Sequence, residues 1–235
     1  MSRESMRDNK VVLVATESAP TSYTAEGKQT GFLVDIMREA FRRAGRPLEI
    51  RFLPFARCLE EAKDGRADGV FVVYRTPQRE SFFNFSDEVV LILRESLFVR
   101  KGDAVSVESG FGSLSDKRLG MVNQTWHGAR LGQAMSDGVI EHVEFANTFD
   151  AAVRMLAEGQ VDVVAAFRDA FLGTARGIHL DGEIEELLPP IDEEPSYVAF
   201  TKTRDMNEVR RAFDNALHEM KKDGTYARIY VKYFR

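Results

Sequence analysis

Short apolar runs alternate with segments of helical periodicity along the first hundred residues. Three runs rich in β-branched and aromatic residues are typical of buried strands: 11–15, 48–53 and 70–73. Between them, residues 32–44 and the segment from Pro54 to Gly65 carry apolar side chains at helical spacing, and Gly45 stands where the first helix would end. This β-α-β-α-β order predicts a parallel sheet with crossover helices.

The same alternation returns in the second half of the chain. Strands are predicted at 118–122, 143–145 and 161–167, and a helix at 149–158. Two longer β-rich segments, 89–100 and 193–200, are placed to join the halves. An amphipathic helix over 207–222 and a final helix over 226–230 follow.

We therefore predict an α/β protein of two lobes joined by two hinge strands. Lobe 1 is discontinuous and covers 10–97 plus 198–235, and lobe 2 covers 98–197. Residues 1–9 are expected to form a disordered lead-in. Two lobes joined in this way make a cleft that closes on a ligand.

Composition excludes several classes of function. The 235 residues have a formal net charge of −5 with mixed signs, which does not indicate a nucleic-acid or membrane-surface binder. The one cysteine, Cys58, cannot form an internal disulfide and is expected to be a buried small hydrophobe. No apolar run approaches the ~18 residues of a transmembrane helix. We expect no metal or other cofactor.

Polar and cationic side chains follow the predicted strand at 70–73. Tyr74, Arg75, Thr76 and Arg79 lie where ligands bind in open α/β sheets, beyond the carboxyl end of a strand. A guanidinium offers paired donors that suit a carboxylate. The alternative for both arginines is a solvated loop charge.

Several segments together resemble the bacterial extracellular solute-binding proteins of the amino-acid-transporter type, over nearly the whole length. The marks, in order, are GFLVDI at 31–36, GRAD at 65–68, TPQR at 76–79, FS at 85–86, SLSD at 113–116, LAEGQVD at 156–162 and DGTY at 223–226. The resemblance implies the two-lobed periplasmic-binding-protein-like (type II) fold and ligand binding in the cleft between the lobes.

The resemblance also implies roles for single residues. Arg79 corresponds to the arginine that clamps the α-carboxylate of the ligand, and Phe55 to the aromatic residue that stacks on it. Gln124, Thr125 and Trp126 belong to a loop that offers hydroxyl and N–H groups. An alternative for Arg79 is a salt bridge inside its lobe.

Two departures from the family pattern concern the ligand. Val72 and Tyr74 stand where small polar residues are usual. Phe167 takes the place of the acidic residue that binds the ammonium group, with Arg168 and Asp169 next to it. Phe167 is expected to be either core or an apolar cleft wall.

Further candidate ligand contacts are Glu17 and Tyr23, near the end of the first strand, and Arg57, which follows Phe55. The alternatives are ordinary loop polarity for the first two and a helix-surface charge for Arg57.

We expect a monomeric periplasmic binding protein, not an enzyme. It would trap an amino acid or related carboxylate and deliver it to the membrane permease of an ABC transporter, with its export signal removed. Because residues 1–10 are polar and charged, the sequence alone also leaves a cytoplasmic protein open. Two alternatives remain open: an enzyme similar to cyclohexadienyl dehydratases, and a detached sensor domain of a receptor.

Overall fold

The computed structural model describes residues 10–107, 110–123 and 128–234, and it divides into two compact units. Unit 1 contains the described part of Met1–Ile92 together with Pro195–Tyr233, and unit 2 contains Leu93–Glu194. Strands β7 (Leu91–Arg100) and β11 (Ile184–Thr201) carry the chain from one unit to the other. The predicted lobe boundaries, 97/98 and 197/198, fall within these same two strands.

The strands of unit 1 follow the order β4-β1-β5-β11, with β6 also paired to β11. Their bounds are β1 Val11–Ala15, β4 Leu48–Phe52, β5 Gly69–Tyr74 and β6 Phe83–Phe85. Strand β1 is parallel to β4 and β5, whereas β5 and β6 are antiparallel to β11. The predicted parallel β-α-β-α-β arrangement is confirmed.

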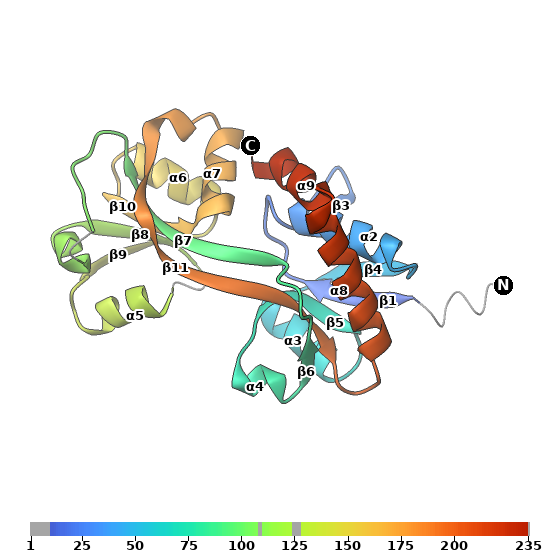
Figure 1. Cartoon of the computed structure of the whole chain (residues 1–235). Helices are drawn as coiled ribbons and strands as arrows, with labels where there is room; N and C mark the ends of the chain where they lie inside the picture. The colour runs from blue at the N-terminus through green and yellow to red at the C-terminus, as the bar shows by residue number, and fades with distance from the viewer. Residues whose placement is uncertain (1–9, 108–109, 124–127, 235) are drawn as a thin grey trace. The chain divides into compact units, whose positions relative to one another are not determined.

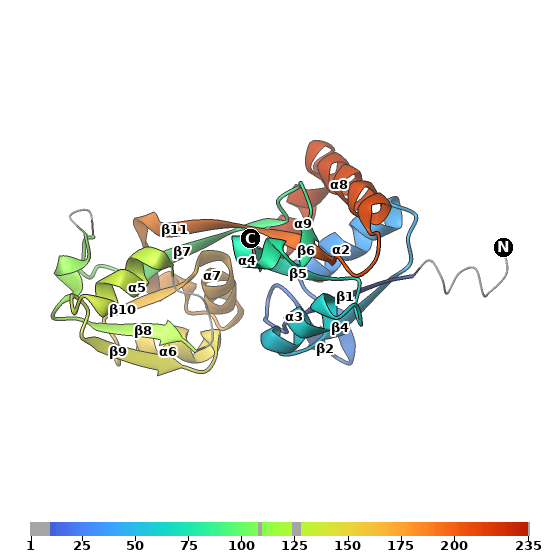
Figure 2. The ribbon, with the colours of Figure 1, turned by 90° about the horizontal axis from the view of Figure 1, so that it is seen from below.

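Helices cover both faces of this sheet (Figures 1 and 2). One face carries α2 (Phe32–Arg43), α8 (Asn207–Lys222) and α9 (Thr225–Phe234), and the other carries α3 (Phe55–Lys63). Phe41 of α2 packs on Phe213 of α8 with ring centroids 5.5 Å apart, and both rings are fully buried. Cys58 lies on the buried face of α3, where a buried residue was predicted, and burial raises the pKa of its thiol to about 11.

Strand β5 contains a β-bulge at Val72. Val73 lies opposite Tyr197 and Phe71 opposite Val198, so Val72 has no counterpart on β11. Its φ of 61° is left-handed, a costly conformation for a β-branched residue. A bulge bends its strand and redirects the residues that follow. The segment from Arg75 to Arg79 leaves the sheet two residues after this irregularity, where β5 ends at Tyr74.

The strands of unit 2 follow the order β7-β10-β8-β9. Their bounds are β8 Arg118–Val122, β9 His142–Ala146 and β10 Val163–Phe167; the helices are α5 Ala129–Ser136, α6 Phe149–Ala157 and α7 Arg168–Gly177. Alternate residues of β10 serve opposite faces. Val164 and Ala166 pack with α6 and α7, whereas Val163 and Ala165 pack with α5. The strand is therefore apolar throughout, as the sequence run 161–167 indicates.

An aspartate fixes the entrance of the corresponding strand pair in each unit. Asp68, just before β5, accepts the backbone N–H of Val12 at 2.7 Å. Asp162, just before β10, accepts the backbone N–H of Arg118 at 2.9 Å. Both aspartates also bind an arginine side chain, and they belong to the GRAD and LAEGQVD motifs. These motif residues therefore hold strands together.

Some elements were not predicted from the sequence. They are β2 (Tyr23–Ala25), β3 (Lys28–Thr30), α4 (Pro77–Glu80), β6 and α7. The first four have only three or four residues, which is too short for a periodic pattern. Helix α7 contains Gly173 and Gly177, and glycine is unfavourable in helices.

Candidate functional site

The candidate site of unit 1 is built where β5 ends. Thr76 has an extended backbone, and its Oγ1 accepts the backbone N–H of Arg79 at 3.3 Å. This contact caps the short helix α4, which starts with Pro77, a residue pre-organised for the first helical position. The cap fixes the backbone from which the Arg79 side chain leaves.

The guanidinium of Arg79 turns back over the end of β5. Its Nη1 donates to the main-chain oxygen of Tyr74 at 3.1 Å. Among the described residues, no carboxylate lies within 4.0 Å of this guanidinium, so no ion pair neutralises it there. Partial burial lowers the pKa of Arg79, but arginine remains charged in proteins. A guanidinium has five N–H donors, so most of them are left for another acceptor.

The ring of Phe55 flanks this cation. Phe55 is the first residue of α3, and the Arg79 Cζ lies 5.5 Å from its ring centroid. The ring is 42% exposed although α3 offers a buried face, where Cys58 and Ala62 lie. In this arrangement the cation suits the carboxylate of a small organic ligand, and the neighbouring exposed ring suits the rest of the ligand.

The other candidates in unit 1 have partners of their own. Glu17 accepts the backbone N–H of Thr24 at 2.6 Å. Tyr23 begins strand β2 and is half-buried. Arg57 forms ion pairs with Glu60 and Glu61 on its own helix, at 3.3 and 2.9 Å. The Arg57 contacts match the helix-surface alternative.

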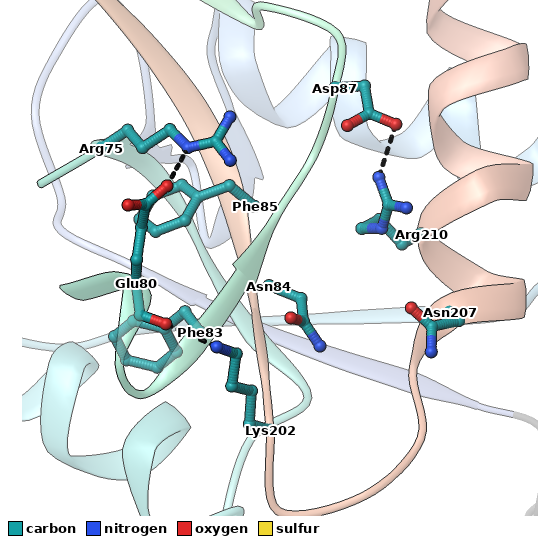
Figure 3. Close-up of a pocket in the computed structure, with 9 residues that line it drawn as sticks. All are labelled: Arg75, Glu80, Phe83, Asn84, Phe85, Asp87, Lys202, Asn207 and Arg210. Carbon is teal, nitrogen blue, oxygen red and sulfur yellow. Dashed lines mark hydrogen bonds and ion pairs between the residues drawn. The ribbon is translucent and has the colours of Figure 1, made fainter. Parts of the chain in front are cut away.

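Next to this segment lies a polar pocket of about 410 Å³, shown in Figure 3, which Arg79 does not line. Its three cations are engaged inside unit 1. Arg75 donates to a carboxylate oxygen of Glu80 and Lys202 to its main-chain oxygen, both at 2.5 Å, and Arg210 pairs with Asp87 at 2.6 Å. Arg79, which has no such carboxylate, is the better anion site.

In unit 2, the structure places Phe167 and Arg168 at the junction of β10 and α7. Phe167 is half-buried. The Arg168 guanidinium pairs with Glu186 at 2.9 Å and with Asp169 at 3.2 Å. The predicted contacts Gln124, Thr125 and Trp126 lie outside the described residues.

A buried carboxylate, Glu95, was missed from the sequence. It is fully buried on β7, directly opposite Phe167 of β10, so both side chains share one face of the sheet. A Cβ on Gly128 would come within 2.7 Å of the Glu95 Oε2 and 2.8 Å of the Asp192 Oδ2. No sequence motif marks this acidic group, because Glu95 lies inside a long, mostly apolar strand pattern.

The family model for bacterial extracellular solute-binding proteins, family 3, matches residues 11–235. The chain belongs to this family. It is similar to the probable amino-acid-binding protein YxeM of Bacillus subtilis, with 26% identity over 97% of this chain and 84% of that protein. It is also similar to the histidine-binding periplasmic protein of Salmonella typhimurium, with 23% identity over 91% of this chain and 82% of that protein.

A further relative is the membrane-bound lytic murein transglycosylase F of Desulfosudis oleivorans, 25% identical over 96% of this chain. The match covers only 48% of that longer protein.

Solved structures confirm the predicted periplasmic-binding-protein-like fold. An ancestral cationic amino acid solute-binding protein matches with a TM-score of 0.79 and 21% identity, over 99% of this chain and 98% of that one. A Streptococcus pneumoniae substrate-binding protein bound to L-arginine matches with a TM-score of 0.71 and 20% identity, over 98% of this chain and 97% of that one. At such identities the likeness shows the fold alone.

The described residues contain neither a metal-ligand cluster nor a membrane-spanning helix. No group of three or more His, Cys, Asp or Glu residues is placed to hold a metal ion there. No described helix is long and apolar enough to cross a membrane.

Proposed function

We propose that this chain is the ligand-binding component of a bacterial transport system. It captures an amino acid or a related small carboxylate, and the ligand's carboxylate binds the Arg79 guanidinium. Residence in the periplasm, a monomeric state and delivery to the permease of an ABC transporter are parts of the same proposal.

The observation that carries the proposal is the electrostatic state of Arg79. Its guanidinium is half-buried, is held by one main-chain oxygen, and lacks a carboxylate within 4.0 Å among the described residues. A desolvated cation is costly unless an anion joins it. A ligand carboxylate provides that anion with paired hydrogen bonds.

The family context supports an amino-acid ligand. Two of the relatives reported above carry names that state amino-acid or histidine binding. Ligands beyond the standard amino acids should be tested as well. Phe167 takes the place of the family's acidic residue, and an aromatic ring offers no carboxylate to an ammonium group.

A thermal-shift screen tests the proposal. The panel contains the standard amino acids, small mono- and dicarboxylates, and polyamines that lack a carboxylate. A ligand at a hundred times its Kd stabilises the folded state by about 2.7 kcal/mol. We expect stabilisation by at least one carboxylate-bearing compound and none by polyamines.

Arg79→Ala should abolish that stabilisation, and Arg75→Ala is the matched control. Arg75 lies in the same segment, but it is already paired with Glu80. A shift that survives Arg79→Ala and disappears in Arg75→Ala would transfer the anion site to the pocket of Figure 3.

A further inference from the structure

A second, strongly basic surface lies on unit 1, between helices α2 and α9. It is a groove of about 610 Å³ with two acidic and five cationic lining residues, a formal charge of +3 on a chain whose total is −5. We call it the basic groove and define it by its cations: Arg38, Arg42, Arg43, Arg228 and Lys232.

The groove's own carboxylates neutralise only part of this charge. Asp35 pairs with Lys232 at 2.7 Å. Glu39 accepts hydrogen bonds from both Arg42 and Arg43 at 2.8 Å, and these bonds lower the pKa of Glu39 to about 2. Asp223, beside the groove, pairs with Arg43 at 2.7 Å. All four pairs are internal, and each uses a cation of the groove wall.

Arg38 and Arg228 have no carboxylate within 4.0 Å among the residues that the structure describes. Arg38 donates to the main-chain oxygen of Gln29 at 2.9 Å, and Arg228 donates to Thr225 Oγ1 at 2.7 Å. Both side chains are held by neutral acceptors, and both belong to exposed residues. The groove therefore presents two ordered guanidinium groups on opposite walls without counter-charges.

The cations form two rows. Arg38 and Arg42 are one turn apart on α2, and Arg228 and Lys232 are one turn apart on α9. Internal contacts hold α9 against α2: Phe32 packs edge-on against Tyr226 at 5.5 Å, and Tyr233 donates to Asp35 at 2.7 Å. The rows are therefore preformed on the two walls of the groove.

We infer that the basic groove docks an acidic segment of a partner protein. Four of the five cations are arginine, whose fork matches carboxylates. Cations one helical turn apart on two walls suit carboxylates spaced along a chain. This surface is distinct from the Arg79 site, and the inference does not depend on the proposed ligand.

Fluorescence anisotropy with a labelled octaglutamate peptide tests the inference on the full chain. The groove variant is Arg38→Glu with Arg228→Glu. The control variant makes the same charge change in unit 2, with Lys101→Glu and Arg154→Glu. We expect the groove variant to bind the peptide about tenfold more weakly than wild type, and the control variant to bind within about twofold. Wild-type affinity should fall as salt rises.

Equal losses in the two variants would show a general charge effect and overturn the inference. No binding of octaglutamate by the wild-type chain would overturn it as well. Cosedimentation with phosphatidylglycerol vesicles, lost only in the groove variant and without peptide binding, would assign the groove to lipid instead. Circular dichroism melts establish that both variants are folded.

Discussion

The two units fix the start of a strand pair in the same way, but they differ in how the arginine beyond the far end of that pair is held. Asp68 and Asp162 each bind a backbone N–H at the start of the neighbouring strand, so the strand pairs begin alike. An arginine also lies beyond the far end of β5 and of β10, the corresponding strands of the two units: Arg79 in unit 1 and Arg168 in unit 2. Arg168 in unit 2 is neutralised by two carboxylates, whereas Arg79 in unit 1 is held by a main-chain oxygen and an aromatic ring.

Under the proposed function, this difference separates a structural arginine, Arg168, from a ligand-binding arginine, Arg79. An ion pair within one unit is satisfied without a ligand. A half-buried guanidinium without a carboxylate gains stabilisation when an anion arrives.

Arg79→Ala should weaken binding of the ligand found in the screen by about a hundredfold, because a charge-assisted paired hydrogen bond is lost. The free protein should keep its stability to within about 1 kcal/mol, since no ion pair of the described residues breaks. Calorimetric titration and thermal melts measure the two effects. Arg79→Lys should recover only part of the affinity, because an ammonium lacks the planar fork.

Arg168→Ala should show the reverse pattern. Removing the guanidinium leaves Glu186 and Asp169 without their shared cation, and we expect a loss of about 1–3 kcal/mol in the free energy of unfolding. Urea denaturation measures it. A variant of unchanged stability and abolished ligand binding would place Arg168 with the binding residues, as the sequence predicted.

Phe55→Ala should reduce ligand affinity about fivefold, because the ring contributes roughly 1 kcal/mol of stacking and cation–π interaction. Phe55→Tyr preserves the ring and serves as the control. Since Phe55 is 42% exposed, its truncation should change the melting temperature little. Equal affinities for the alanine and tyrosine variants would contradict the role of the ring.

Acid should weaken the ion pair that fixes the unit 2 strands. Hydrogen bonds from Arg118 lower the pKa of Asp162 from 3.8 to about 2. A carboxylate whose pKa is lower in the folded than in the unfolded state stabilises the fold at pH values above its unfolded-state pKa. This stability is lost as the pH falls from about 4 to 2. Asp162→Asn should cost about 1 kcal/mol at pH 7 and less at pH 2. Melts across this range, compared with wild type, check the sign.

The fold was predictable because its strands and helices carry strong periodic signals. The run 70–73 became β5, and the helix predicted over 207–222 became α8 with the same bounds. The bulge at Val72 was not predictable, since nothing in a β-branched run indicates a left-handed φ. It changes which way the following residues leave the sheet.

The site was only partly predictable. Sequence position made Arg75 and Arg79 candidates, and the family resemblance singled out Arg79 and Phe55. The pairing state of Arg57 and Arg168 depends on carboxylates that approach only in the folded chain, such as Glu186, eighteen residues after Arg168. Glu95 was hidden for the same reason, because strand pairing brings it opposite Phe167.

A double-mutant cycle between Arg79 and the ligand's carboxylate tests the central claim most directly. The ligand and its carboxamide analogue are titrated by calorimetry into wild type and Arg79→Ala. We predict that amidation weakens binding to wild type by about a hundredfold and changes binding to the variant less than threefold. An equal loss in both proteins would show that the carboxylate binds elsewhere.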